Sequence, residues 1–553
     1  MKALICAINT KYIHSSLAPW YLKAAFENAC SDGSECEIIE TTINETEDEI
    51  LKQILEKEFD LIGFSTYIWN LNIVISLCKK IKEKRNVEIL LGGPEVSYNA
   101  REILEKYSYI DYVISGEGER PFAELCAGKS CDEIQGLCYK TGGDVVIKPP
   151  FNSCVEPPSP YTKEYFERLN GRIAYIETSR GCPYKCAFCL SGRCDGVKFF
   201  DLEVAKKNIV LLANSGAKTV KFIDRTFNAD KKRAKELFKF IIACSEDEIV
   251  PEEVTFHFEI EGDILDDETI EILSKARVGL VQVEIGLQSF NEKTLHAINR
   301  KAQTQRLTDN VKRLLESQNI HVHIDLIAGL PYEDFNSFAE SFNKALSLKP
   351  HMLQLGFLKL LHGADLRNEA KEFSIEFDSI PPYEVRSTSW ISNDELNQLR
   401  TLEDFFDRFY NSQRFARTVE YIWKNVDSPF DFYLQCANFV KENQKEKSLD
   451  EFSKIVYDYL CSIKGFDKNI VRDVMAMDRL ATNRTGSLPQ FLKISSSTLK
   501  ERLNMLERNP ATRRKKGIKR AATFLKSENA LVYVDYDFKN LVTNEYKILK
   551  TII

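Results

Sequence analysis

The stretch Thr178-Ser-Arg-Gly-Cys-Pro-Tyr-Lys-Cys-Ala-Phe-Cys-Leu190 places three cysteines, Cys182, Cys186 and Cys189, at CxxxCxxC spacing after an apolar, strand-like run. A loop this short can direct three thiolates at one iron–sulfur cluster and leave one iron of a four-iron cluster open for another ligand. A zinc site would need a fourth ligand, for which Cys194 is the nearby candidate. Three reduced cysteines without a metal are the remaining interpretation of this pattern.

The composition is that of a folded chain with ample material for a core. The 553 residues allow roughly three domains, and 44% of them are hydrophobic and 28% charged. A net charge of −7 argues against coating of nucleic acid, although it allows a local basic patch. The sequence has no apolar run of membrane-spanning length and no signal peptide, and fifteen cysteines favour a reducing compartment. An open cluster also implies low oxygen, so we expect an anaerobic, cytoplasmic enzyme that uses no membrane.

Residues 1–145 alternate short apolar runs with amphipathic segments. This alternation predicts a doubly wound, Rossmann-like parallel sheet. Ligands of such sheets bind beyond the carboxyl ends of the strands. The strand-like runs cover 3–8, 37–40, 61–65, 88–91 and 112–115, and the helix-like segments cover 17–29, 46–57, 72–84 and 99–107.

Four loops that follow these strands carry glycines, in the loops from residues 92 and 116, or small polar residues, in the loops from residues 9 and 65. Glycines let backbone amides approach a ligand closely, and hydroxyl groups can bond to it. One Gly-Gly-Pro is often only a turn, but four such loops at one edge of a sheet indicate a large cofactor. The candidate residues are Asn9, Tyr12, His14, Ser15, Ser65, Thr66, Tyr67, Trp69, Asn70, Gly92, Gly93, Pro94, Glu95, Gly116, Glu117 and Gly118.

A proline-rich linker over 146–172 leads to a second series of strands and helices. Six strand-like runs begin at residues 173, 219, 254, 280, 321 and 352, with helix-like segments between them. Over 173–376 these six βα units resemble a partial (β/α)6 barrel of the TIM type. Active sites of such barrels gather at the carboxyl ends of the strands.

The fourth and fifth strands of this series carry polar residues on one face. Alternation with period two separates these residues from an apolar face. Polar groups inside a barrel need partners, which a polar ligand would supply. A second metal is the alternative, although polar lining of the barrel is the interpretation that we favour. The polar residues are Gln282, Glu284, Gly286 and Gln288 in the fourth strand and His321, His323 and Asp325 in the fifth.

The cysteine stretch, with the aromatic Phe188 before its last cysteine, resembles the signature of the radical S-adenosylmethionine (SAM) superfamily. The runs 222–227, 284–290 and 325–331 resemble the second-, fourth- and fifth-strand motifs of that superfamily. This resemblance implies a [4Fe–4S] cluster on the three cysteines, with SAM on the open iron. Arg300 could pair with the SAM carboxylate, or it could form only a surface salt bridge. The residues implied to contact SAM are Phe188, Asp224, Glu284, Gln288, Arg300 and Asp325.

The order of the domains resembles that of cobalamin-dependent radical SAM enzymes, which makes the four loops of the first domain candidate cobalamin contacts. The Asp-x-His-x-x-Gly motif, which supplies a histidine to cobalt in methionine-synthase-type domains, is absent, and His14 is the only histidine of this domain. We therefore expect cobalt to lack a histidine from this motif. By analogy Trp69 would lie against the lower face of the corrin, and its alternative is packing in the core.

Residues 377–553 predict a mainly α-helical third domain that ends in a strand-like hairpin over 531–538. This layout resembles a branch of the family with an uncharacterised C-terminal domain. The basic run over 508–520 is either a solvated loop or a weak contact for RNA phosphates.

The resemblance implies a C-methyltransferase that uses a 5′-deoxyadenosyl radical and methylcobalamin on an unactivated carbon. The substrate, whether a small molecule, a peptide or an RNA, is not indicated, and an electron donor such as flavodoxin or ferredoxin would reduce the cluster. The same cofactors could instead catalyse a non-methylating rearrangement or cyclisation. A tRNA-modifying methylthiotransferase would need a second cluster on Cys6, Cys36 and Cys78. A sensor based on these cofactors would leave SAM uncleaved.

Overall fold

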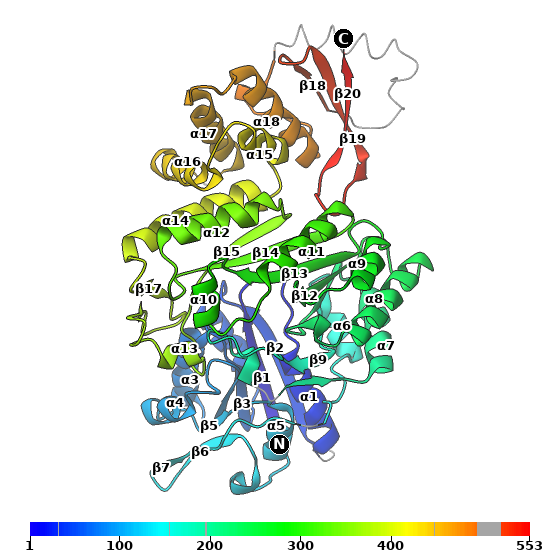
Figure 1. Cartoon of the computed structure of the whole chain (residues 1–553). Coiled ribbons are helices and arrows are strands. Elements are labelled where there is room, and N and C mark those ends of the chain that lie inside the picture. Colours follow the sequence, from blue (N-terminus) through cyan, green and yellow to red (C-terminus); the bar gives the residue numbers. More distant parts are fainter. Residues whose placement is uncertain (31–32, 154, 194–195, 447, 495–520, 553) are drawn as a thin grey trace. The chain divides into compact units, whose positions relative to one another are not determined.

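The computed structural model describes residues 1–553 except 31–32, 154, 194–195, 447, 495–520 and 553 (Figure 1). The basic run over 508–520 therefore lies outside the described residues. The chain forms two compact units. The first comprises residues 1–275, 293–302 and 357–389, and the second comprises residues 276–292, 303–356 and 390–553.

The first unit begins with a seven-stranded sheet in the order β2-β1-β3-β4-β5-β6-β7. Strands β1 to β5 are parallel, which confirms the predicted doubly wound sheet, and β6 and β7 extend it as an antiparallel hairpin that the sequence did not predict. Helices α1 and α5 pack together, as do α2 and α3. The elements are β1 (Lys2–Asn9), α1 (Ala18–Ala29), β2 (Glu35–Thr42), α2 (Glu47–Ile54), β3 (Leu61–Ser65), α3 (Leu71–Lys84), β4 (Glu88–Gly92), α4 (Ala100–Lys106), β5 (Tyr112–Ile114), α5 (Glu119–Cys126), β6 (Leu137–Thr141) and β7 (Asp144–Val146).

Local signals in the sequence explain how this sheet starts. In β1 the residues from Ala3 to Asn9 are all buried, as is typical of a parallel strand that is covered on both faces. Helix α2 begins with a capping box, in which Thr46 Oγ1 accepts a hydrogen bond from the Glu49 amide and the Glu49 carboxylate accepts one from the Thr46 amide. Parallel strands joined by such helices direct their following loops to one edge of the sheet.

The first unit continues into three parallel strands in the order β8-β11-β12, each followed by a helix. Two short antiparallel strands, β9 and β10, flank the cysteine loop on either side in the chain. The elements are α6 (Lys163–Leu169), β8 (Ala174–Ile176), β9 (Ser179–Gly181), β10 (Val197–Phe199), α7 (Leu202–Ala213), β11 (Thr219–Phe222), α8 (Lys231–Glu246), β12 (Thr255–Ile260) and α9 (Asp267–Ser274).

The second unit contains the parallel strands β13 and β14, with β15 beside β14. All six strands that the sequence predicted for the partial barrel are therefore present, in the predicted chain order. Along β13 buried and half-buried residues alternate strictly, and the polar set from Gln282 to Gln288 occupies the half-buried face as predicted. The elements are β13 (Val281–Gln288), α11 (Thr304–Glu316), β14 (His321–Ala328), α12 (Phe335–Ser347) and β15 (Met352–Phe357). Helix α10 (Glu292–Ala297), which lies between β13 and α11 in the chain, belongs to the first unit except for its first residue.

The C-terminal part of the second unit is mainly helical, as predicted. The hairpin expected over 531–538 is wrong, because these residues form one strand, β19, that pairs with both β18 and β20. The chain reverses outside that stretch, near Asn529 and Asn544, which adopt left-handed backbone angles with φ of 48° and 57°. The elements are α14 (Asn393–Phe406), α15 (Ala416–Trp423), α16 (Pro429–Asn443), α17 (Leu449–Ser462), α18 (Lys468–Thr482), β18 (Ala522–Leu525), β19 (Ala530–Lys539) and β20 (Tyr546–Ile552).

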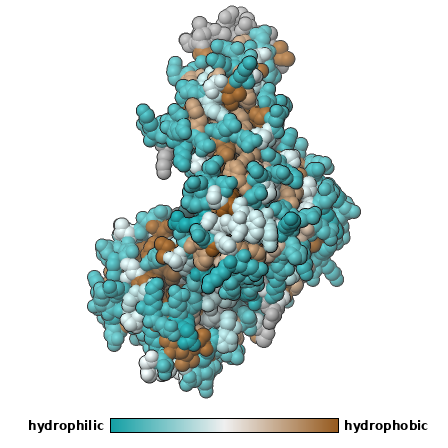
Figure 2. All heavy atoms as spheres, turned by 60° about the vertical axis from the view of Figure 1, so that its left-hand side comes forward, coloured by the Kyte–Doolittle hydropathy of each residue, from teal (hydrophilic) through white to brown (hydrophobic). Residues whose placement is uncertain are grey.

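Hydrophilic residues dominate the surface drawn in Figure 2, in keeping with the high content of charged residues. On the face drawn in Figure 2 most atoms belong to hydrophilic residues, and apolar residues form scattered patches. Among the described residues, no helix combines the length and the apolar character that crossing a membrane requires.

A cluster of four phenylalanines fills the core beside β11 and β12. The ring centroid of Phe258 lies 4.4 Å from that of Phe222, 4.6 Å from that of Phe227 and 5.1 Å from that of Phe238. All four side chains are at least 97% buried. Aromatic pairs at these separations add to the stabilisation that burial itself provides.

We expect Phe258→Ala to destabilise the protein by about 3–5 kcal/mol, because the substitution leaves a cavity in a closely packed aromatic core. The midpoint of denaturant-induced unfolding would measure this change. Phe538→Ala serves as the control, since the Phe538 side chain is 63% exposed and should shift the midpoint little. Equal shifts for the two variants would contradict the packing argument.

A buried carboxyl group, that of Glu333, lies in the loop between β14 and α12. Its Oε1 accepts hydrogen bonds from the hydroxyls of Ser289 at 2.5 Å and Ser341 at 3.2 Å. Its Oε2 has no hydrogen-bond partner among the residues that the structure describes. Burial raises the pKa of Glu333 to about 7, against the lowering effect of the two serines.

The raised pKa of Glu333 makes stability depend on pH. The folded protein holds this proton up to about pH 7, whereas the unfolded chain loses it near pH 4.5, so stability falls as pH rises through that window. We expect Glu333→Gln to remove this loss and to be the more stable form at pH 8, by up to about 3 kcal/mol. Unfolding midpoints between pH 5 and 8 would test this. Glu340→Gln, on the exposed side of α12, should retain the wild-type dependence on pH.

Candidate active site

The cysteine loop holds its three sulfur atoms next to separate polar groups. Cys182 Sγ lies 3.2 Å from Thr226 Oγ1, and Cys189 Sγ accepts a hydrogen bond of 3.4 Å from the Ser191 amide. Cys186 is buried, which raises the pKa of its thiol, and a guanidinium nitrogen 3.8 Å away opposes that rise. Three thiols with donors around them fit an iron–sulfur cluster with one open iron. The fourth zinc ligand considered above, Cys194, lies outside the described residues.

The guanidinium beside Cys186 belongs to Arg300, which the sequence predicted as a SAM contact. Arg300 Nη2 lies 3.0 Å and 2.8 Å from the two carboxylate oxygens of Glu261, and both side chains are more than 90% buried. Sequence reasoning missed Glu261. Its signal was a charged residue directly after the alternating strand β12, at the carboxyl end where barrel sites gather.

Asp224 lies behind the cysteine loop. Its Oδ1 accepts hydrogen bonds from Thr178 Oγ1 at 2.7 Å and Ser179 Oγ at 2.6 Å, and its Oδ2 accepts one of 2.9 Å from the Thr178 amide. Burial raises the pKa of Asp224 to about 6 despite these donors. Asp224, which the sequence predicted as a SAM contact, therefore fixes Thr178 and Ser179, the residues that lead into the cysteine loop. Phe188 is half-buried within the loop itself.

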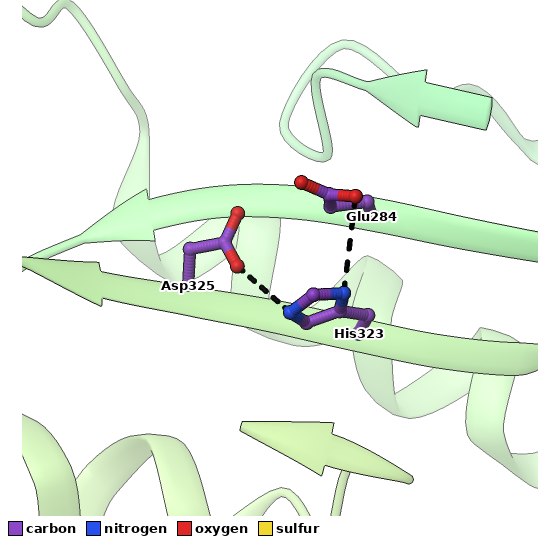
Figure 3. Close-up of side chains that lie close together, drawn as sticks. All are labelled: Glu284, His323 and Asp325. Carbon is purple, nitrogen blue, oxygen red and sulfur yellow. Dashed lines mark ion pairs between the residues drawn. The ribbon is translucent and has the colours of Figure 1, made fainter. Parts of the chain in front are cut away.

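Three polar residues that the sequence placed inside the barrel, Glu284, His323 and Asp325, lie close together on β13 and β14 of the second unit (Figure 3). His323 is buried between two carboxylates, with its Nε2 2.9 Å from Asp325 Oδ1 and its Nδ1 3.9 Å from Glu284 Oε2. Gln288 ends β13 with φ of 70°, where the pairing with β14 is irregular. Glu284, Gln288 and Asp325 are each half-buried and lie on the polar face of their strands.

A cavity of about 570 Å³ lies at the carboxyl edge of the N-terminal sheet in the first unit. Its inner wall is apolar and includes Ile5, Leu90 and Phe122, whereas its rim is polar and charged. A Cβ atom added at Gly92 would meet no atom of the described residues within 4 Å, because it would point into this space. Such an amphipathic cradle fits a large cofactor with an apolar end. Eight predicted residues line it: Ser65, Tyr67, Gly92, Gly93, Pro94, Gly116, Glu117 and Gly118.

Arg180 organises the charged rim of this cavity. Its guanidinium lies 2.9 Å from Glu117, 2.8 Å from Glu119 and 2.8 Å from Glu177. Burial raises the pKa of Glu117, and Arg180 opposes that rise. Carboxylates and a guanidinium at a rim can bond to the amide side chains of a corrin, so the rim fits cobalamin. Of these four residues the sequence analysis predicted only Glu117 as a cofactor contact. Glu119 ends the same glycine-rich loop, whereas Glu177 and Arg180 belong to the stretch that leads into the cysteine loop.

The loop after β1 does not join this cavity. Asn9, Tyr12 and His14 line a separate cavity of about 320 Å³, and Ser15 Oγ donates to the Ile173 carbonyl at 2.7 Å. His14 forms a β-bridge with Ile173 and lies 2.7 Å from a tyrosine hydroxyl of β8. These contacts, which are distant in the chain, hold the loop after β1 against β8 and the residue that precedes it.

Four further predicted residues do not line the cavity but bond to the protein around the loops that do. Trp69 stacks on Tyr67 with ring centroids 4.3 Å apart and donates from Nε1 to the Ile8 carbonyl, so Tyr67 rather than Trp69 lines the cavity. Asn70 bonds to the carbonyls that end β1 and β3, and Thr66 Oγ1 donates to the Gly92 carbonyl. Glu95 is buried, which raises its pKa to about 7, and it accepts a hydrogen bond from the hydroxyl of Tyr383.

Family models match three successive parts of the chain. The B12 binding domain matches residues 3–126, the radical SAM superfamily matches residues 176–345, and a protein family of unknown function, DUF4080, matches residues 371–548. A B12-binding domain implies cobalamin, and a radical SAM domain implies a [4Fe–4S] cluster and SAM. The resemblance predicted from the sequence is therefore confirmed.

Two curated relatives and one solved structure illustrate the similarity. The cobalamin-dependent radical SAM methyltransferase TokK of Streptomyces tokunonensis is 27% identical over 57% of this chain and 49% of its own length. The 2-(S-pantetheinyl)-carbapenam-3-carboxylate methyltransferase of Streptantibioticus cattleyicolor is 25% identical over 61% and 54%. The chain thus spans about half the length of these relatives.

The structure of the cobalamin-dependent SAM radical enzyme OxsB, with aqua-cobalamin and SAM bound, shares the fold with a TM-score of 0.61. It is 14% identical and covers 93% of this chain and 82% of its own. The sequence motifs, the parallel sheets and the order of the three family matches agree. The chain therefore combines an N-terminal B12-binding domain, a central radical SAM domain and a C-terminal DUF4080 domain.

Proposed function

We propose that the chain is a cobalamin-dependent radical SAM C-methyltransferase that acts on an unactivated carbon of its substrate. One observation carries the proposal. The wall of the large cavity, formed by the loops of the B12-binding domain, also includes Gly181, which precedes Cys182, and Leu190 and Ser191, which follow Cys189. The cysteine loop and the candidate cobalamin site therefore share a wall within one unit, as a reaction that uses both cofactors requires.

The residues of this chain supply binding, orientation and exclusion of water. When bound, the reduced cluster supplies an electron that cleaves SAM, and cobalamin supplies a methyl carrier. We assign the cluster to Cys182, Cys186 and Cys189. Arg300 is fixed by Glu261 beside Cys186, where a guanidinium can pair with the SAM carboxylate.

The remaining contacts with SAM are assigned by chemistry. We propose that Glu284, Gln288 and Asp325 take the sugar and base of SAM, because each presents carboxylate or amide oxygens on a half-buried face. We propose that Asp224 affects SAM binding indirectly, by fixing the residues that lead into the cysteine loop. Phe188 would contact SAM from its position between the cluster ligands Cys186 and Cys189. Tyr67 takes the place against the corrin that the sequence analysis gave to Trp69.

A methylthiotransferase is disfavoured by the cysteines of the first domain. Cys6, Cys36 and Cys78 are buried in β1, β2 and α3. Burial raises the pKa of Cys6 and of Cys36 to about 12, and it raises the pKa of Cys78 as well. These cysteines lie in two strands and a helix rather than in one short loop, so they lack the arrangement that the cysteine loop offers a cluster.

The proposal includes an electron donor, because radical SAM chemistry needs a reductant. A flavodoxin or a ferredoxin has the required low potential, and we propose one of these as the partner. The many free cysteines and the oxygen-sensitive cluster favour a reducing, anaerobic cytoplasm. The contact with RNA considered for 508–520 falls outside the described residues and is not part of this proposal.

Cys186→Ala should abolish formation of 5′-deoxyadenosine, because it removes one of three cluster ligands. The measurement is chromatography of products after anaerobic incubation of the reconstituted protein with SAM and a low-potential reductant. Iron content and electron paramagnetic resonance report the cluster directly. Cys30→Ala is the matched control, since Cys30 lies outside the cysteine loop at the end of α1. Undiminished cleavage by the Cys186 variant would refute the radical SAM assignment.

Gly92→Leu should block cobalamin, because Gly92 lines the cavity and a Cβ atom there would meet no described atom within 4 Å, so that a longer side chain would extend into the cavity. Gly92→Ala, with a smaller side chain, should weaken binding less. Corrin absorbance after gel filtration measures retention, and methyl-labelled SAM measures transfer of the label to cobalamin and then to product. Label in both supports the methyltransferase. Radical cleavage of SAM with retained cobalamin but without transferred label would favour a rearrangement or cyclisation instead.

A further inference from the structure

One segment of the first unit, residues 360–383, has no part in the chemistry assigned above. It contains the short helix α13 (Asp365–Asn368) and the strand β16 (Glu376–Phe377). We call this segment the strap. It contacts two separate loops, and residues of both loops line the large cavity.

The first contact is with the cysteine loop. The Leu366 amide donates a hydrogen bond of 2.9 Å to the carbonyl of Ala187, which lies between Cys186 and Cys189. The neighbouring Asp365 forms an ion pair of 2.6 Å with Arg193, whose side chain lines the cavity. Leu366 is fully buried, so this end of the strap is packed into the protein rather than resting on its surface.

The second contact is with the loop after β4. Gly363 has φ of 87°, and a Cβ atom there would lie 2.4 Å from Cγ of Tyr98, so the ring of Tyr98 packs directly on the strap backbone. Tyr98 lines the cavity, as do Gly93 and Pro94 at the start of the same loop.

A buried hydrogen bond completes this second contact. The hydroxyl of Tyr383 donates to the carboxylate of Glu95, which follows Pro94, and both side chains are only 3% exposed. The Tyr383 ring is enclosed by Arg367, 4.8 Å from its centroid, and by His362, 5.0 Å away in an edge contact. A buried carboxyl group is costly to leave without its donor, so this bond strongly favours one position of the loop.

We propose that the strap is a positioning element that couples the cysteine loop to the loop after β4, so that loading of the cluster tightens the binding of cobalamin. Tyr383 and Asp365 are its positioning residues, one at each contact. Neither touches a reacting atom, and both act through the loops that they hold. The inference rests on the proposed function, because it concerns the same two cofactors.

The test is a titration of the full-length protein with cobalamin before and after anaerobic reconstitution of the cluster. Changes in corrin absorbance measure the Kd. We expect reconstitution to tighten binding by about fivefold or more in the wild type, and by less than about twofold in Tyr383→Phe and in Asp365→Asn. Both variants should still take up about four iron atoms per chain. The substitution of Asp365, which is half-exposed, should leave folding intact.

Tyr410→Phe is the matched control. Tyr410 is also buried and donates its hydroxyl to a backbone carbonyl, that of Pro350, in the second unit. This variant loses a comparable hydrogen bond and should keep the coupling of the wild type. A general loss of stability would change all variants alike, whereas the proposed role changes the coupling only when the strap is altered.

Two results would overturn the inference while leaving the proposed function intact. One is equal affinity of the wild type for cobalamin with and without the cluster. The other is undiminished coupling in both strap variants. A protein that assembles the cluster but takes up no cobalamin in either state would overturn the inference together with the proposed function.

Discussion

The cysteine loop depends on one buried carboxylate, that of Asp224. Removing a carboxylate from water is unfavourable unless hydrogen bonds replace its hydration. Asp224 follows β11 and accepts three hydrogen bonds from Thr178 and Ser179, the residues that lead into the loop. Burial still raises its pKa to about 6, so these donors must support an anion at neutral pH. The position of the backbone that leads to Cys182 is therefore set by a residue that follows a neighbouring strand, and not by the loop itself.

The next residue in the chain extends this constraint to the B12-binding domain. Arg180 turns away from Asp224 toward Glu117 and Glu119, which belong to the loop after β5 and the start of α5. Removing one member of a buried ion group leaves its partners uncompensated, so such groups hold their elements in a defined arrangement. Three consecutive residues thus tie the approach to the cysteines to β11 on one side and to the cavity rim on the other. This arrangement explains why the two candidate cofactor sites share a wall.

Regular patterns made much of this structure predictable, and long-range contacts account for the rest. The parallel sheets follow from alternating strands and helices, and eight loop residues of the cavity follow from strand ends that are rich in glycine or hydroxyl residues. The loop of His14 departs from the prediction because it bridges to Ile173, far along the chain. Trp69 and Tyr67 are both aromatic residues of the loop after β3, so the sequence does not show which of them lines the cavity. The hydrogen bond from the Trp69 indole to the Ile8 carbonyl, a contact distant in the chain, distinguishes them. Glu261 was missed because its partner, Arg300, follows a different strand.

The group of Glu284, His323 and Asp325 illustrates how geometry separates two interpretations that composition allows. Their ligand atoms all lie within 4.8 Å of one another, which is close enough to consider a second metal. However, the two nitrogens of His323 face different carboxylates, at 2.9 Å and 3.9 Å, whereas a single ion would take one nitrogen together with both carboxylates. The imidazole thus lies between two carboxylates on the polar faces of adjacent strands. We therefore still favour polar lining of the barrel over a second metal at this group, and this interpretation stays a prediction.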